Sequence, residues 1–445
     1  MTSKAHNSTA AAPPPSHNLL LVSDVHLARF RPHMMQGGQN LFGAFLDHHA
    51  RTRLGQRPWR LIVNGDLLDF DHQASSIHER SHEAESLLLF EGIEAASRDA
   101  FLGFARFLEA GHEVVIIPGN HDRDLMWPRV REAFVEAVGV HLLDRAALAR
   151  LSFHDWFYYE PGRIYVEHGH QYEPDTSLCG MLDPFIEGSP TAIRRDLATW
   201  WIADFCPLIP EIAYHVDHTR GPLFYLPIVI RSLAWKAPYL WVKLLSFIFR
   251  TVASAGIQTV RSSARHAERR AQLGRESGLG EEKLRAIEAC MITPRISSRL
   301  QTAGRLHMAA AVIFPFVAVF GVLGAILGSW LLGGWALGLF GALVVLNMSV
   351  SSRFAGHNVA SLRKAAGQLQ ELVGTPIVSF GHNHAATDEP AGAGRYLNSG
   401  TWSDPRVPNS YLRVVGSRGE VRGWEAEGAP ALAPDSAEAP ERALA

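Results

Sequence analysis

Short apolar runs separated by polar segments fill the first 170 residues of the chain. Each run spans four or five positions, is rich in aliphatic and β-branched residues, and leads into a loop that contains Gly, Asn, Asp or His. Such runs are typical of strands buried on both faces of a sheet. They cover residues 19–22, 60–63, 113–117 and 163–166, and a fifth at 376–380 precedes a candidate strand and turn at 396–402.

Helical patterns lie between these strands, at residues 43–53, 83–110 and 129–138. Alternation of strand and helix predicts a layered α/β domain, in which the loops after the strands gather at one edge of the sheet. This alternation stops after about residue 178 and returns near residue 372. Between these points, residues 223–250 are aromatic and aliphatic without an acidic residue, and residues 261–289 are charged and helix-prone.

One segment of this middle region, residues 306–352, contains no Asp, Glu, Lys or Arg. A helix of ~20 residues spans a bilayer, so the segment predicts a two-pass transmembrane hairpin with helices near 309–327 and 330–346. The alternative is a hairpin buried in a soluble core, which is disfavoured because charge-free runs of this length are rare in soluble helices. Two passes also return the chain to the side of the membrane from which it entered.

Basic residues flank both ends of this hairpin, and the turn between its helices has none. The positive-inside rule therefore predicts a multi-pass protein of the inner (cytoplasmic) membrane with two helices and its catalytic domain in the cytoplasm. The flanking residues are Arg295, Arg299, Arg305, Arg353, Arg363 and Lys364.

The same patterns divide the 445-residue chain into six segments. Both termini are rich in small, polar and Pro residues and are expected to be disordered. The segments are a leader at 1–18, the first part of the core at 19–178, a basic, aromatic-rich helical insertion at 179–305, the hairpin at 306–352, the last part of the core at 353–424 and a tail at 425–445.

Composition adds three constraints. The formal net charge is only −2, so the chain as a whole is no polyanion binder and no nucleic-acid partner is expected. The charge is uneven, since residues 194–305 hold 17 Lys or Arg against 9 Asp or Glu. The three cysteines form no CxxC or Cys/His spacing, which excludes a disulfide framework and a structural zinc site and suits a reducing compartment.

Five polar clusters follow the apolar runs in order. They are Asp24-Val25-His26, Gly65-Asp66-Leu67-Leu68-Asp69, Gly119-Asn120-His121-Asp122, His168-Gly169-His170 and Gly381-His382-Asn383-His384. Any one of them alone is weak evidence, but all five in sequence supply carboxylate, imidazole and amide ligands for two divalent metals, without a thiolate. Two such metals about 3.5–4 Å apart can hold one hydroxide between them and clamp a phosphate in line.

For some residues in or near these clusters, the sequence is consistent with more than one role. His121 can act as a general acid near neutral pH, whereas Asp69 is equally consistent with orienting His121 and with capping a turn. Asp122 is expected to be structural, and His170 either faces substrate or satisfies its loop. Arg194 and Arg195 are expected to form a solvated surface pair rather than a phosphate site. The histidines outside the clusters are expected to be solvated: His48, His49, His72, His78 and His82. For His72 a place in the lining of the pocket is the alternative, because it follows closely after Asp69.

The five clusters together resemble the calcineurin-like metallophosphoesterase superfamily, over residues 19–170 and 376–402. The resemblance implies a four-layer α/β/β/α sandwich and two divalent ions, with Mn²⁺ as the first expectation and Fe or Zn as alternatives. It implies that His121 protonates the leaving group or stabilises the equatorial charge of the phosphoryl group, and that Asp69 orients His121. It also implies one metal held by Asp24, His26, Asp66 and His384 and a second held by Asp66, Asn120, His168 and His382.

Within that superfamily the chain is most similar to the UDP-2,3-diacylglucosamine hydrolase-like branch, through its Ser-Asp-x-His-Leu opening, compact core and helical insertion. It departs from that branch by placing His121, not Arg, after Gly119-Asn120, and by carrying its own membrane hairpin. No residue is assigned to substrate binding. The basic, aromatic insertion, with Lys236, Lys243 and Arg250 at spacing seven, fits either an amphiphilic substrate or the bilayer alone.

The expected function is hydrolysis of a phosphoester or pyrophosphate bond in a lipid-linked substrate by a membrane-anchored, dinuclear-metal enzyme, through in-line attack of a metal-bridging hydroxide. One alternative is a tethered phosphodiesterase or phosphatase for a soluble substrate, such as a cyclic nucleotide or a phosphoprotein. The other is a non-enzymatic scaffold, which would have no chemical need for seven metal ligands and His121. The expected partners are the phospholipid bilayer and an amphiphilic phosphate or pyrophosphate.

Overall fold

The structure of the protein is a computed structural model. It describes residues 16–29, 38–71, 80–178, 180–186, 189–197, 199, 237–255, 264–305, 357–404 and 407–424, together with single residues between 326 and 342. The predicted leader and tail fall mostly outside these described residues.

The first of two large sheets contains the strands that precede the N-terminal clusters. Its order is β14-β13-β1-β2-β4-β5, in which β1, β2, β4 and β5 run parallel and β13 pairs antiparallel to β1. The strands are β1 (Asn18–Val22), β2 (Trp59–Asn64), β4 (Glu113–Ile117), β5 (Leu151–Phe153), β13 (Asn409–Val415) and β14 (Arg418–Trp424).

The second large sheet joins chain segments from both sides of the insertion. Its order is β11-β12-β10-β7-β6, with β7, β10 and β12 parallel, so the C-terminal strand β10 lies between β12 and β7. The strands are β6 (Phe157–Glu160), β7 (Ile164–Glu167), β10 (Ile377–Phe380), β11 (Thr387–Ala391) and β12 (Gly394–Asn398).

The two sheets pack face to face through alternate strand residues, because successive side chains of a strand point to opposite faces. Leu21, Ile62 and Val115 of the first sheet share one apolar cluster with Val166 and Ile377 of the second. The other side chains of the first sheet, among them Leu20 and Val63, pack instead against helices. The fold is therefore built around an apolar layer between two sheets.

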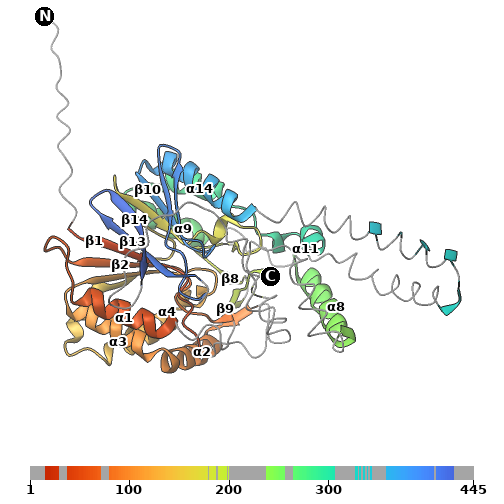
Figure 1. Cartoon of the computed structure of the whole chain (residues 1–445), viewed down its shortest axis with the longest axis horizontal. Coiled ribbons are helices and arrows are strands. Elements are labelled where there is room, and N and C mark those ends of the chain that lie inside the picture. Colours follow the sequence, from red (N-terminus) through yellow and green to blue (C-terminus); the bar gives the residue numbers. More distant parts are fainter. Residues whose placement is uncertain are drawn as a thin grey trace, which may run out of the picture.

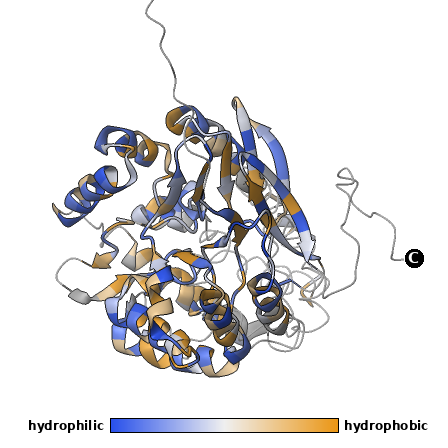
Figure 2. Ribbon diagram, turned by 90° about the vertical axis from the view of Figure 1, so that its left-hand side faces the viewer, coloured by the Kyte–Doolittle hydropathy of each residue, from blue (hydrophilic) through white to orange (hydrophobic). Residues whose placement is uncertain are grey.

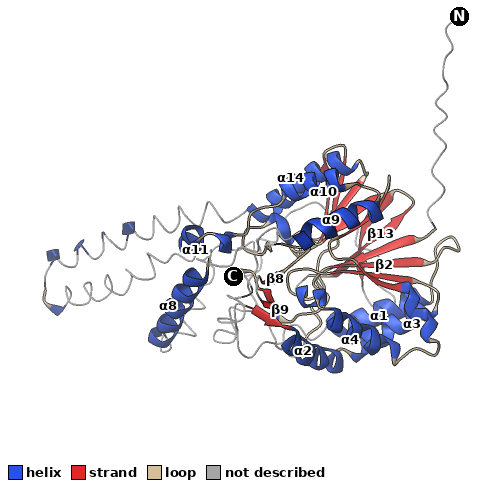
Figure 3. Cartoon of the chain, turned by 180° about the vertical axis from the view of Figure 1, so that it is seen from behind, coloured by secondary structure: helices blue, strands red, loops and turns tan. Residues whose placement is uncertain are grey.

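Helices cover the outer face of each sheet, which completes a helix-sheet-sheet-helix arrangement (Figures 1 and 3). The helices of the first face bury large aromatic side chains such as Phe45, Phe104 and Phe134 against the sheet. These helices are α1 (Gly38–Ala50), α2 (Glu83–Ala96), α3 (Arg98–Glu109) and α4 (Pro128–Gly139). The outer face of the second sheet is covered by α14 (His357–Val373) and α10 (Glu281–Cys290), with α9 (Ala264–Ser277) beside them. Figure 2 shows hydrophobic residues on the sides of these elements that face one another.

The layered α/β prediction agrees with this structure, but two details of the sequence analysis are wrong. The helix predicted over 83–110 is two helices, because the chain leaves helical geometry at Ser97, with φ −118° and ψ 25°. His49, expected to be solvated, is 5% exposed, and its Nδ1 pairs with the carbonyl oxygen of Phe45 one turn earlier. His48 is half-buried and His82 exposed, while His72 and His78 lie outside the described residues.

The insertion does not begin with a helix. Strands β8 (Phe185–Ile186) and β9 (Ser189–Arg194) form a small sheet with β3 (Arg80–His82) of the core, so the chain first pairs with the domain that it leaves. Further on, α8 (Ala237–Ser254) contacts α11 (Arg299–Arg305), which follows a 3₁₀ turn at Arg295–Ser297.

The predicted transmembrane hairpin lies almost entirely outside the described residues. Among the residues that are described, no helix is both long enough and apolar enough to span a bilayer. Single residues of the segment that are described have highly exposed apolar side chains, for example Trp330 at 94% and Trp335 at 77%.

Replacing Ile62 by Ala tests the layer between the sheets. Ile62 is fully buried there, so we expect the substitution to lower the free energy of unfolding by about 2–5 kcal/mol, as for other large-to-small core changes. The measurement is chemical denaturation of detergent-purified full-length protein, followed by circular dichroism. The control is Leu143→Ala, because Leu143 is 97% exposed and should change stability by less than about 0.5 kcal/mol. Equal losses in both variants would contradict the described core.

Candidate metal centre

The polar clusters predicted from the sequence meet at one edge of the two packed sheets. Asp24, Asp66 and Asn120 follow β1, β2 and β4 of the first sheet, while His168 and His382 follow β7 and β10 of the second. Six of the seven predicted ligands are buried, and the side chain of His384 is 36% exposed. The structure therefore brings together residues that lie more than 350 positions apart in the sequence.

Asp24, His26 and His384 form one group that could hold a metal ion. Oδ2 of Asp24 accepts a hydrogen bond from the backbone N–H of His382 at 3.0 Å, while Oδ1 lies 3.3 Å from Nε2 of His384. The Nε2 atoms of His26 and His384 are 3.3 Å apart. Two imidazole nitrogens and a carboxylate oxygen at these spacings suit ligands of a single cation, for which metal–ligand distances are about 2.0–2.2 Å.

Asp66, His168 and His382 form a second such group. Nδ1 of His168 pairs with the backbone carbonyl oxygen of Asn64 at 2.8 Å, an interaction in which Nδ1 must carry the proton. Nε2 of His168 lies 3.2 Å from Oδ2 of Asp66. Burial lowers the pKa of His168, but the negative charge of Asp66 outweighs burial and raises it to about 9. Only the neutral ring, with its proton on Nδ1, would offer a lone pair on Nε2 to a metal.

The carboxylate of Asp66 lies between the two groups. Its Oδ1 accepts a hydrogen bond from the backbone N–H of His121 at 2.9 Å. Its Oδ2 lies 3.2 Å from Nε2 of His168 and 3.8 Å from Nε2 of His26. Burial favours the neutral acid, but the neighbouring His168 and His121 outweigh it and hold the pKa of Asp66 well below its usual range. Asp66 is thus an ionised carboxylate in contact with both groups.

Three polar atoms of the predicted ligands are buried without a hydrogen-bond partner among the described residues, although two of them lie 3.2–3.3 Å from an oppositely charged group. They are Oδ1 of Asn120, Oδ1 of Asp24 and Nε2 of His168. Buried polar atoms in native proteins are almost always satisfied, so each such atom calls for an explanation. All three belong to predicted ligands, and their oxygen and imidazole chemistry fits hard or borderline divalent cations.

The backbone around the centre is held in an unusual conformation. Asp24, His26, Asp66, His382 and His384 have φ between +51° and +70°, in the left-handed region. Among the described residues, only Gln56 joins them as a non-glycine with positive φ. Such residues cost about 1–3 kcal/mol each and persist where the surrounding structure imposes them, most often at functional sites. The strain coincides with five of the seven predicted ligands.

Asp122 fixes the loops rather than facing the groups. Its carboxylate accepts backbone hydrogen bonds from Gly119 and Leu67, the latter at 2.7 Å, and it thereby ties the loop after β4 to the loop after β2. This agrees with the structural role expected for it.

His121 lies beside the ring of His26, with ring centroids 4.8 Å apart. Its Nδ1 is 3.5 Å from Oδ1 of Asp69 and also 3.5 Å from Oδ2 of Asp71. Burial lowers the pKa of His121, but the negative charges of Asp66, Asp69 and Asp71 outweigh burial and raise it to about 10. Asp69 also accepts the N–H of Asp71 at 3.1 Å, so both roles considered for Asp69 are present in the geometry.

Asp71 also belongs to a buried cluster of charged residues that the sequence analysis missed. Arg123 donates to Asp71 at 2.7 Å and to Asp196 at 2.9 Å, and Arg195 donates to Asp71 at 3.2 Å. Arg195 is only 2% exposed, so its expected place in a solvated pair is wrong. A charge of this kind stays buried because its partners neutralise it. The side chain of Arg194 is outside the described residues.

Glu173 was likewise missed. Its Oε2 lies 2.7 Å from Nε2 of His382, and Oγ1 of Thr176 lies 3.1 Å from the same nitrogen. No sequence pattern marks Glu173, since its contact is with a residue 209 positions away.

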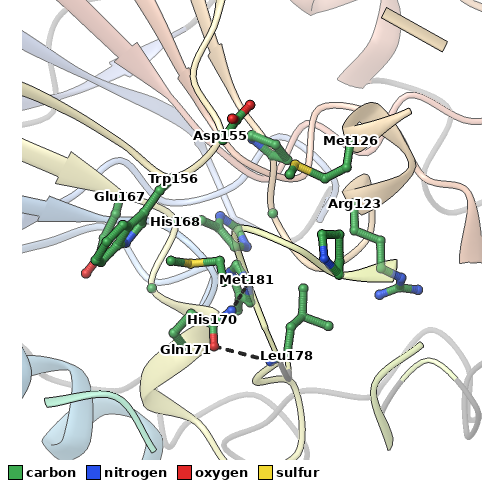
Figure 4. Close-up of a pocket in the computed structure, with 14 residues that line it drawn as sticks. Arg123, Met126, Asp155, Trp156, Glu167, His168, His170, Gln171, Leu178 and Met181 are labelled. Atoms are coloured by element: carbon green, nitrogen blue, oxygen red, sulfur yellow. Dashed lines mark hydrogen bonds between the residues drawn. The ribbon is translucent and has the colours of Figure 1, made fainter. Parts of the chain in front are cut away.

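His170 lines a small cavity behind the centre (Figure 4). The cavity holds about 20 Å³, which is room for one or two waters but not for a substrate. The cavity is also lined by Trp156, Leu178 and Met181. The side-chain oxygen of Gln171, another lining residue, accepts a hydrogen bond from the backbone N–H of Leu178 at 3.2 Å. His170 pairs with Gln171 at 3.0 Å, which supports a role in ordering this loop.

At the common edge of the two sheets the described residues thus form three groups that could hold a metal ion, because His26, Asp66 and His121 make up a further group between the two described above. Residues 17–203 match the sequence profile of the calcineurin-like phosphoesterase family, which supports a metal-dependent phosphoesterase domain of the metallophosphoesterase superfamily over this part of the chain. The match includes Asp24, His26, Asp66, Asn120 and His168, and the structure adds His382 and His384 from beyond it. No curated protein shows significant similarity to the chain.

Gly119→Ala is expected to damage the centre without changing any ligand. A Cβ atom at this position would lie 2.1 Å from Oδ1 of Asp66, closer than any real contact, so the carboxylate must move. We expect at least tenfold weaker Mn²⁺ binding, measured by calorimetric titration of the full-length protein. Gly367→Ala in α14 is the control, because its Cβ would meet nothing closer than 3.5 Å. Unchanged binding in Gly119→Ala would contradict the geometry around Asp66.

Proposed function

We propose that the protein is a membrane-anchored phosphoesterase that uses two divalent metal ions to hydrolyse a phosphoester or pyrophosphate bond in a lipid-linked substrate. The observation that carries this proposal is the position of the Asp66 carboxylate, whose Oδ2 lies 3.2 Å from Nε2 of His168 in one candidate group and 3.8 Å from Nε2 of His26 in the other. A carboxylate between two sets of imidazole and oxygen ligands can bridge two metal ions, and two ions held close together can clamp the attacking and leaving oxygens of a phosphoryl group.

In this proposal Asp24, His26, Asp66 and His384 hold one ion, and Asp66, Asn120, His168 and His382 hold the other. Mn²⁺ is the first choice and Fe and Zn are the alternatives, since mixed oxygen and imidazole ligands suit all three metals. The bound ions would supply an activated nucleophile and neutralise charge on the phosphate. The buried atoms of Asn120, Asp24 and His168 that lack a hydrogen-bond partner among the described residues support this assignment.

His121 is proposed as the residue that donates a proton to the leaving-group oxygen. Its ring packs against His26 at the edge of the first group, which places it beside any phosphate bound there. Asp69, together with Asp71, would fix the orientation of the imidazole from equal distances of 3.5 Å. A carboxylate partner of this kind sets the tautomer of a catalytic histidine.

Helix α8 supports the proposed place at a membrane. Tyr239, Val242 and Phe249 are 54%, 66% and 50% exposed on a helix whose Phe247 and Ile248 are buried. Lys243 is exposed on the same side, with its ammonium 5.7 Å from the ring of Tyr239. Exposed aromatic residues interspersed with basic ones are typical of helices that lie in the bilayer interface.

The position of α8 in the fold supports the same proposal. Helix α8 contacts α11, and α11 ends at Arg305, where the charge-free segment 306–352 begins (Figure 1). The segment proposed to enter the membrane thus leaves the domain next to α8. In this arrangement the catalytic domain lies on the cytoplasmic side of the inner membrane, in contact with an amphiphilic phosphate or pyrophosphate.

The substrate is tested with detergent-purified full-length protein and Mn²⁺. UDP-2,3-diacylglucosamine is the first substrate, and we expect release of UMP by the wild type, loss of at least 10³-fold in Asp66→Ala and loss of turnover in EDTA. Asp388→Ala is the matched control, since Asp388 forms only an exposed pair with Arg395. Hydrolysis of a generic aryl phosphodiester without UMP release would overturn the lipid substrate and keep the two-metal reaction. Hydrolysis of neither would favour the scaffold.

The role of His121 is tested by comparing substrates whose leaving groups differ in acidity. In His121→Asn we expect kcat to fall about 10²–10⁴-fold for a substrate with a poorly acidic alcohol as leaving group. The loss should be much smaller for p-nitrophenolate, which departs without needing a proton. Equal losses for both substrates would argue against proton donation by His121 and for a role in binding the phosphate.

A further inference from the structure

The loop that carries Glu173 joins the metal centre to the insertion. On one side of this loop, Glu173 and Thr176 both approach Nε2 of His382, at 2.7 and 3.1 Å. All three residues are buried, with exposures of 7%, 2% and 4%. An imidazole nitrogen that donates its proton to a carboxylate has no lone pair for a metal, so the contact with Glu173 assigns Nδ1 of His382 as the atom that faces the ion.

The other side of the loop is held by the last segment of the insertion. The backbone N–H groups of Ile292 and Arg295 donate to the carbonyl oxygens of Gln171 and Pro174, at 2.9 and 2.8 Å. The guanidinium of Arg295, a residue only 6% exposed, pairs with the carboxylate of Asp175. Two backbone hydrogen bonds and a largely buried ion pair thus fix residues 171–175 from the side of the insertion.

Arg295 is in turn tied to α11. Oγ1 of Thr302 donates to the carbonyl oxygen of Arg295 at 3.1 Å, and α11 ends three residues later, at Arg305. Contacts therefore connect α11 through Arg295 to Pro174 and Asp175, which follow Glu173 in the chain. Glu173 in turn contacts His382.

We propose that Glu173 is a positioning residue for the second metal ion and that Arg295 holds Glu173 in place, so that the insertion sets the metal affinity of the centre. The inference rests on the proposed function for the assignment of His382 as a ligand. A carboxylate that hydrogen-bonds to a ligating histidine fixes its ring and raises its basicity. Removing such a partner typically weakens metal binding 10–100-fold.

The test is calorimetric titration of detergent-purified full-length protein with Mn²⁺ alone, so that its readout does not depend on turnover. For the wild type we expect two binding events. Glu173→Ala should weaken one of them 10–100-fold and leave the other within twofold. Glu173→Gln keeps the size of the side chain and a hydrogen-bond acceptor but loses the charge, so it should give an intermediate loss. It also serves as the second variant if Glu173→Ala does not fold.

The contribution of the insertion is tested with two arginines of the same segment. Arg295→Ala should weaken the same binding event as Glu173→Ala, because Asp175 loses its partner and the loop is released. Arg299→Ala is the matched control. The guanidinium of Arg299 donates to the carbonyl oxygens of Ala255 and Ala253 in and after α8, at 2.9 and 3.3 Å, and does not contact the loop in the described structure.

Three results would overturn the inference: unchanged affinities in Glu173→Ala, equal effects of Arg295→Ala and Arg299→Ala, or no Mn²⁺ binding by the wild type. The last of these would also remove the proposed function. A wild type that binds two ions but hydrolyses no phosphoester, with the expected losses in Glu173→Ala and Arg295→Ala, would contradict the proposed function alone and uphold the inference.

Discussion

Packing of the two sheets against each other determines where the chemistry of this protein lies. Leu21, Ile62 and Val166 have no polar role, yet their shared apolar layer aligns the ends of β1 and β2 with those of β7 and β10. Parallel strands place their loops at one edge of a sheet, and stacking two such sheets places two sets of loops opposite each other. Each metal group can then draw its ligands from both sheets.

The centre that results carries a cost in stability that the rest of the fold must offset. Two aspartates are buried beside several histidines, and five ligand residues adopt the left-handed backbone conformation. Strain of this kind persists only where the surroundings impose it. Here the imposing contacts include the backbone hydrogen bonds of Asp122 and the pairing of the His382 N–H with Asp24. Because metal binding adds to the folded state alone, ions in the centre would stabilise the whole domain.

Most of the structure that positions the centre could be predicted from the sequence, because the parallel strands of a buried sheet appear in the sequence as continuous apolar runs. β4 begins and ends where it was predicted, and β1, β2, β7 and β10 differ by a residue or so. The antiparallel strands β13 and β14 were missed, since polar and charged residues such as Arg413 and Glu420 interrupt their short apolar stretches.

The parts of the centre that could not be predicted depend on tertiary contacts. Glu173 and Asp71 have no neighbours in the sequence that mark them, and their partners lie 209 and 52 positions away. Arg195 was assigned to solvent because charged residues are usually exposed. It is buried because Asp71, 124 positions earlier, supplies the opposite charge. A single sequence shows which residues can bind a metal but not which residues will surround them.

The place of β10 in the second sheet has a consequence for synthesis of the chain. β10 lies between β12 and β7, so β7 has an unpaired edge until residues beyond 377 have left the ribosome. Chains fold from their N-terminal end during translation, and incomplete sheets leave apolar faces and strand edges exposed. The insertion is therefore always translated before the centre can close. A nascent chain has the candidate ligands from Asp24 to His168 early, and the candidate metal centre becomes complete only in the last stretch of synthesis.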